Sequence, residues 1–110
     1  MLYLDHAATS PVRPEVLDAM RPFLAGVFGN PSSHHTYGEA AASALDEARA
    51  RVARVLGMRS GDVIFTSGGT ESNNLAVKGI VLAALARGRG HLVVSPIEHE
   101  SILELSLIHI

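Results

Sequence analysis

The chain has 110 residues, of which 47% are hydrophobic and 18% are charged, and this balance excludes a disordered tail. Its formal net charge of -2 comes from interspersed acids and bases, so no basic stripe favours nucleic acid or an anionic membrane as a partner. The chain contains no cysteine, which excludes a disulfide framework or a thiolate zinc site in this segment.

The sequence has no recognisable targeting or membrane segment. Its first residues lack the basic start and the apolar core of a signal peptide. The longest apolar stretch, residues 79–86, is too short to cross a bilayer. We therefore expect a cytoplasmic protein with no membrane partner.

The first third of the chain predicts an arm, a helix and a loop. Residues 1–14 carry two prolines around short apolar pieces, which indicates an extended arm with turns. A short helix with one apolar side is predicted over residues 15–27, although it contains Pro22. Residues 28–35 are rich in Gly, Asn, Pro and Ser and predict a polar loop.

The clearest helical pattern covers residues 37–56. Apolar residues recur there at spacings of three and four, which is typical of an amphipathic helix, and they are Ala41, Leu45, Ala48, Val52 and Val55. Gly57 follows at the place of a left-handed C-terminal cap.

The second half of the chain predicts a βαβ unit. Residues 62–66 and 91–95 are short apolar runs without alternation, as expected for strands that are buried on both faces. A helical segment, residues 70–87, lies between them. We therefore expect two parallel strands with a right-handed crossover, and a further helix that begins near residue 99.

A glycine turn joins the first predicted strand to this helix. Gly68 and Gly69 let the backbone approach a ligand, and the first N–H groups of the helix favour an anion such as phosphate. The pattern lacks the Lys-Ser/Thr ending of an NTPase loop and the glycine spacing of a dinucleotide fingerprint. In the alternative interpretation the glycines only tighten the turn, Thr70 caps the helix and the Glu71 carboxylate favours the dipole.

His99 follows the second predicted strand. Turns that follow parallel strands leave the same edge of a sheet, so His99 and the glycine turn should face one crevice. A neutral imidazole there can stack on a flat ring or move a proton. The other histidines show no metal-ligand spacing, and we expect no metal site.

Four ordered segments of the chain resemble the opening of the cysteine desulfurases. They are YLDHAATSP at residues 3–11, FGNPSS at 28–33 followed by His35 and Gly38, IFTSGGTESNNLA at 64–76, and Glu98-His99. The resemblance implies the N-terminal part of a fold-type I, class V aminotransferase architecture, which is α/β with a mostly parallel seven-stranded sheet. It also implies pyridoxal 5'-phosphate as cofactor and a homodimer.

The activity that the resemblance implies is removal of sulfur from L-cysteine. The products are L-alanine and an enzyme persulfide, which a sulfur-acceptor scaffold protein would receive for iron–sulfur cluster or thio-cofactor assembly. By position, Gly69 and Thr70 match residues that bind the cofactor phosphate. His99 matches the histidine that stacks on the cofactor ring and is proposed to move protons, and Asn30 and His35 fall in a segment near the substrate entrance.

The resemblance also divides the chain. Residues 1–14 correspond to an N-terminal arm and residues 15–104 to the start of the cofactor-binding domain, whereas residues 105–110 depart from the family pattern and suggest a frameshift or foreign sequence. The family's cofactor lysine and persulfide cysteine lie further along, and Lys78 is the only lysine here. We therefore expect residues 1–110 alone to be inactive.

Two alternatives stay open at this point. One is a selenocysteine lyase or another class V enzyme. The other is a phosphate-binding or interaction module without catalysis.

Overall fold

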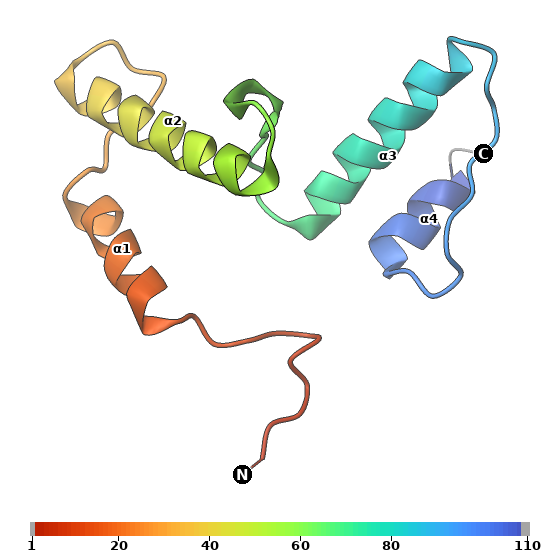
Figure 1. Cartoon of the computed structure of the whole chain (residues 1–110), viewed down its shortest axis with the longest axis horizontal. Helices are drawn as coiled ribbons and strands as arrows, with labels where there is room; N and C mark the ends of the chain where they lie inside the picture. Colours follow the sequence, from red (N-terminus) through yellow and green to blue (C-terminus); the bar gives the residue numbers. More distant parts are fainter. Residues whose placement is uncertain (1, 109–110) are drawn as a thin grey trace. The chain divides into compact units, whose positions relative to one another are not determined.

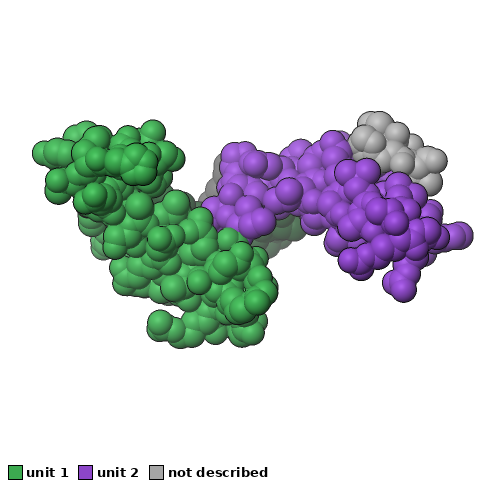
Figure 2. Space-filling view, turned by 90° about the horizontal axis from the view of Figure 1, so that it is seen from above, with its two compact units in different colours: residues 1–63 green, residues 64–110 purple. Residues whose placement is uncertain are grey.

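The computed structural model describes residues 2–108, which form four α-helices and one short 3-10 helix (Figure 1). These elements fall into two units, Met1–Val63 and Ile64–Ile110, which are coloured separately in Figure 2. Each unit is described below by itself.

The first helix of unit 1 is α1, Pro14–Ala25. Pro14 stands in its first turn, where the missing N–H costs no hydrogen bond. The Gly26 N–H donates to the Pro22 carbonyl at 2.9 Å and closes the helix. The helix thus ends two residues before the predicted limit at Val27, and Pro22 lies inside its last turn.

The second helix, α2, spans Thr36–Leu56 and confirms the strongest helical pattern of the sequence. Its N-cap is His35, whose Nδ1 accepts a hydrogen bond from the Gly38 N–H at 3.3 Å. At the other end Gly57 has a φ of 66°, the left-handed conformation that the sequence predicts. The Met58 N–H donates to the Ala53 carbonyl at 2.9 Å, so the helix ends in a Schellman motif.

The predicted polar loop folds onto the first turn of α2. The Asn30 side chain accepts from the Ser32 N–H at 2.9 Å, and the Asn30 carbonyl accepts from the Ser33 N–H at 2.9 Å. A Cβ on Gly29 would lie 2.0 Å from the Tyr37 carbonyl oxygen, and one on Gly38 would lie 2.1 Å from the Ser33 carbonyl oxygen. Only glycine allows this close approach of loop and helix.

A short 3-10 helix, η1 at Ser60–Asp62, packs against α2. The Arg49 side chain on α2 donates from Nε to the Val63 carbonyl at 3.2 Å, which ties the two elements together. Arg59 pairs with Asp62 through two hydrogen bonds of 2.9 Å.

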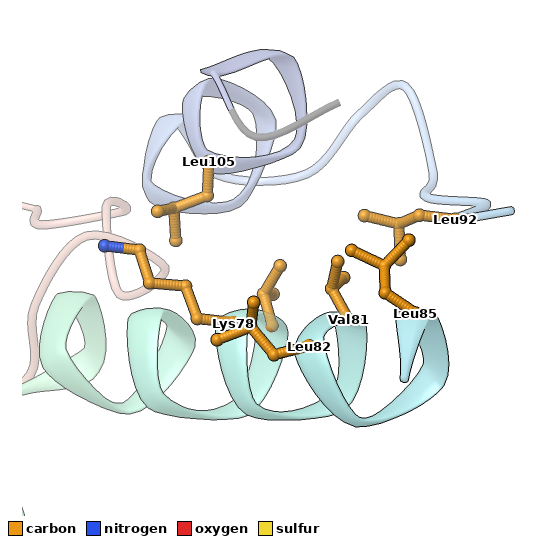
Figure 3. Close-up of a pocket in the computed structure, with 7 residues that line it drawn as sticks. Lys78, Val81, Leu82, Leu85, Leu92 and Leu105 are labelled. Atoms are coloured by element: carbon orange, nitrogen blue, oxygen red, sulfur yellow. The ribbon is translucent and has the colours of Figure 1, made fainter. Parts of the chain in front are cut away.

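Unit 2 consists mainly of α3, Gly69–Leu85, and α4, Glu100–Ile108, which lie side by side (Figure 1). Leu105 of α4 is buried and faces a hollow above the C-terminal half of α3 (Figure 3). The hollow is lined by Val77, Lys78, Val81, Leu82, Leu85, Leu92 and Leu105. The helix thus includes residues 105–108 of the tail that the sequence analysis sets apart, and residues 109–110 lie outside the described part.

The predicted strands are absent from residues 2–108. Asp62 belongs to η1, while residues 63–66 and 91–95 have no regular secondary structure and join no ladder in this part of the chain. Ile64 and Val93, expected in strand interiors, are 68% and 87% exposed. The physical reason is that a lone pair of parallel strands is marginal, because its outer N–H and C=O groups and apolar faces need further strands and helices. Among the described helices, none combines the length and the apolar character needed to span a membrane.

The close contact of Gly38 with the loop leads to a prediction about the stability of unit 1. Gly38→Ala should lower the free energy of unfolding of unit 1 by about 1–3 kcal/mol, because the new Cβ must displace backbone atoms. Urea denaturation followed by circular dichroism measures the change. Gly61→Ala is the matched control, since no atom lies within 4 Å of a Cβ there. Equal stability of the two variants would contradict the close packing.

Candidate functional site

A hollow in unit 2 gathers the residues that the sequence singles out as chemically important. It is lined by Gly69, Thr70 and Asn73 of α3 together with His99 and Ser101 at the start of α4. The glycine turn and His99 therefore face one space, as predicted. The contact between α3 and α4 creates this arrangement without a sheet edge in the described part of the chain.

Side-chain hydrogen bonds hold the turn that precedes α3. The Thr66 and Ser72 hydroxyl oxygens lie 2.6 Å apart, and Thr66 Oγ also donates to the Gly68 carbonyl at 3.2 Å. The Ser67 N–H donates to the Glu71 carboxylate at 2.7 Å, and the Ser67 hydroxyl donates to the same carboxylate oxygen. These two bonds lower the pKa of Glu71, the hydroxyl contributing more than the N–H.

The structure separates the two interpretations of Thr70. Gly68, not Thr70, occupies the N-cap position, and no side chain caps the helix there. Thr70 is the second residue of α3, so its hydroxyl has no capping role in this conformation. The Glu71 carboxylate turns back to Ser67 and accepts hydrogen bonds from its N–H and its hydroxyl.

The start of α3 offers donors and space to a ligand. The backbone N–H groups of Gly69 and Thr70 donate no hydrogen bond to any group within residues 2–108. A Cβ on Gly68 or Gly69 would meet no protein atom within 4 Å, and neither residue has a φ in the left-handed region that favours glycine. The protein itself thus does not require glycine here, whereas a ligand seated against the backbone would.

His99 caps α4 and is linked to α3. Its carbonyl accepts from the Ile102 N–H at 2.8 Å, and its Nδ1 accepts from the Ser101 N–H at 3.1 Å. The Ser101 hydroxyl lies 2.9 Å from His99 Nδ1, and its oxygen accepts from Asn73 Nδ2 at 2.8 Å. The imidazole is exposed and lies on the wall of the hollow.

The site's residues fit a flat aromatic ligand that carries a phosphate. Backbone N–H groups at the positive end of a helix suit the phosphate, and the imidazole offers a face for ring stacking. No cluster of three or more metal-binding side chains occurs in the described part of the chain. Pyridoxal phosphate has both the ring and the phosphate that this arrangement can hold.

The other two predicted site residues belong to unit 1 and have local structural roles there. Asn30 holds the loop through its side chain and carbonyl, and His35 caps α2. Lys78 lines the apolar hollow shown in Figure 3 and is absent from the residues that line the hollow around Thr70.

Sequence reasoning missed Asn73 and Ser101. They lie 28 positions apart, so no local pattern links them. Only Ser101 carried a weak signal in the sequence. It stands two residues after His99, and a serine that closely follows a helix N-cap can form a hydrogen bond with the capping side chain.

Comparison with known proteins identifies the family. The aminotransferase class-V family matches residues 2–107, and the chain belongs to this family.

Within the family, the chain is similar to proteins described as cysteine desulfurases. It is 50% identical over 103 residues to cysteine desulfurase IscS of Dictyoglomus turgidum, a match that covers 94% of this chain and 26% of that protein. It is 49% identical over 102 residues to putative cysteine desulfurase IscS 1 of Bacillus subtilis, covering 93% of this chain and 27% of the relative. The chain thus spans about a quarter of the length of these relatives.

A solved structure described as SspA in complex with cysteine has a closely similar backbone. The TM-score is 0.84 at 40% sequence identity, and the match covers 96% of this chain and 30% of that one. The backbone of this chain is therefore similar to that of the matching part of the SspA structure.

The hydrogen bonds of Glu71 predict a pH effect. Because its folded pKa is lowered, the carboxylate stabilises the turn fully above the pKa of the unfolded chain, and this contribution is lost as the pH falls through the lowered value. Ser67→Ala should raise the pKa of Glu71, as followed by carbon-13 NMR of its carboxyl. Ser67→Thr retains a hydroxyl and should keep the pKa low. An identical titration in Ser67→Ala and the unsubstituted chain would refute the assignment.

Proposed function

We propose that the chain is the cofactor-phosphate-binding portion of a pyridoxal-phosphate-dependent cysteine desulfurase. The reaction removes sulfur from L-cysteine and yields L-alanine and an enzyme persulfide for iron–sulfur cluster or thio-cofactor assembly. The observation that carries this proposal is the meeting of Gly69, Thr70 and His99 around one hollow in a chain of this family.

In this proposal the start of α3 binds the cofactor phosphate. The N–H groups of Gly69 and Thr70 point out of the first helical turn, and the helix dipole favours the negative charge. The Thr70 hydroxyl adds a further donor. Ser67 keeps the Glu71 carboxylate bound to the turn, so that the charge is held by a hydrogen bond within the protein.

His99 serves the ring side of the same site. Its imidazole stacks on the cofactor ring and moves a proton near the reacting atoms, which a neutral imidazole can do close to pH 7. Bound pyridoxal phosphate supplies a ring into which electrons from the substrate's α-carbon can drain.

The remaining parts of the proposal concern the larger protein. It is a homodimer in the cytoplasm, and its mostly parallel sheet incorporates residues 62–66 and 91–95 as strands. Asn30 and His35 lie near the substrate entrance, and the persulfide is passed to a scaffold protein. The exposure of Ile64 and Val93 supports the sheet, because strand neighbours would cover both side chains.

A chimera tests the activity. Residues 3–104 replace the matching segment of the Dictyoglomus turgidum relative, which is 50% identical in this region. The purified chimera, loaded with pyridoxal phosphate, should release alanine and transfer sulfur from L-cysteine. A folded, cofactor-loaded chimera that forms no alanine above the level of free cofactor would overturn the proposal.

The first prediction for the site concerns Thr70. A charge-assisted hydrogen bond contributes about 1.5–3 kcal/mol, so Thr70→Ala should weaken phosphate-dependent binding roughly tenfold or more. Pyridoxine 5'-phosphate is a suitable NMR probe, because it has no aldehyde to react with Lys78. Pyridoxine without phosphate is the ligand control, and Thr70→Ser, which keeps the hydroxyl, is the protein control. Equal affinity of Thr70→Ala and the unsubstituted chain would show that the Thr70 hydroxyl does not bind the phosphate.

The second prediction concerns His99 in the chimera. General acid–base groups supply about a hundredfold or more in rate, so His99→Ala should slow turnover by at least that factor. Because His99 also caps α4, His99→Asn is the informative companion: asparagine is a good N-cap but has no imidazole. His99→Asn should retain its helix content by circular dichroism, and both variants should lose activity. Full activity of His99→Asn would show that capping alone matters.

A further inference from the structure

The hydrogen bonds around His99 assign different roles to its two ring nitrogens. Nδ1 lies 3.1 Å from the Ser101 backbone nitrogen, which can only donate. A ring nitrogen that accepts from an N–H must present its lone pair, so the proton of the neutral ring is on Nε2. Nε2 itself makes no hydrogen bond within residues 2–108.

The Ser101 hydroxyl reinforces this assignment through Asn73. The Asn73 amide nitrogen donates to Ser101 Oγ at 2.8 Å, and this occupies a lone pair of the hydroxyl oxygen. The hydroxyl proton is then free to point to His99 Nδ1, 2.9 Å away. The donors run in one direction, from Asn73 through Ser101 to the imidazole.

The chain of bonds is better shielded than the histidine that it holds. Asn73 and Ser101 are half-buried between α3 and α4, whereas the His99 ring is exposed on the wall of the hollow. A single residue that only capped α4 would need no partner on another helix. The bond from Asn73 anchors the cap to the helix that begins at Gly69 and Thr70.

We propose that Asn73 and Ser101 are positioning residues that fix the His99 ring, with Nδ1 turned into the protein and the Nε2–H presented to a ligand in the hollow. The inference rests on the proposed function, because a bound cofactor or substrate is what Nε2 would meet. Ser101→Ala and Asn73→Ala should therefore change the state of the His99 ring without removing the imidazole.

Nitrogen-15 NMR of the 110-residue chain tests the proposal without any ligand. The spectrum of the unsubstituted chain should show His99 as the Nε2–H form alone, with the Nδ1–H form below detection. The exposed His34 of the same sample is the internal reference for tautomer exchange. Ser101→Ala and Asn73→Ala keep the Ser101 N–H as a donor to Nδ1 but remove the anchor to α3. A fraction of His99 rings should then turn away from that N–H and show the Nδ1–H form, and Ser101→Thr should suppress it again.

Asn74→Ala is the matched control. Its amide also lies in the first half of α3, but it donates to the Thr70 carbonyl at 2.9 Å instead of to Ser101. This variant should leave the His99 spectrum unchanged. Tautomer exchange at His99 in the unsubstituted chain, or equal spectra in Asn73→Ala and Asn74→Ala, would overturn the proposal.

A second readout uses pyridoxine 5'-phosphate. Loss of a neutral hydrogen bond that orients a contact should weaken its binding about two- to tenfold in Asn73→Ala and Ser101→Ala, but not in Asn74→Ala. Equal affinities in all three variants would contradict the proposal that Asn73 and Ser101 orient the His99 ring toward the ligand. No binding to the unsubstituted chain would count against the proposed function, while the tautomer measurement still decides whether the two residues hold the ring.

Discussion

The hydrogen bond between Asn73 and Ser101 is the constraint on which the site geometry of unit 2 depends. It joins Asn73 of α3 to Ser101 at the start of α4 across 28 positions of sequence, and the two helices are in contact. Because His99 is the N-cap of α4, the same bond places the imidazole beside Gly69 and Thr70. Donor groups for an anion and a ring for stacking thereby line the same hollow.

The helix α3 is divided along its length into two chemically different halves. Its first turn and the preceding turn carry hydroxyl, carboxyl and amide groups that bond to one another. Its second half lines the apolar hollow with Val77, Val81 and Leu85. Lys78 lies eight residues beyond Thr70, about 12 Å along the helix axis, and its stem covers the apolar side. Lys78 is not among the residues that line the hollow around Thr70.

Sequence patterns predicted the elements that are stabilised by residues close to one another in sequence. The stripe from Ala41 to Val55 and the left-handed Gly57 made α2 recognisable, since both depend on residues close in sequence. His35 was placed near a substrate entrance by resemblance, whereas its observed contact is the cap of α2. The strands could not be judged from their own residues, because a parallel strand is stabilised by partners distant in sequence. The link from Asn73 to Ser101 was out of reach for the same reason.

The close contact between Gly29 and the first turn of α2 bears on the order in which the chain folds. This corner is built entirely from residues 29–38. It comprises the hydrogen bonds of Asn30, the cap by His35 and the close backbone approach at Gly38. A loop of about ten residues closes in about 10–100 ns, whereas synthesis adds about 5–20 residues per second. The corner at the start of α2 can therefore form on the ribosome, long before the residues of unit 2 that build the candidate site have been made.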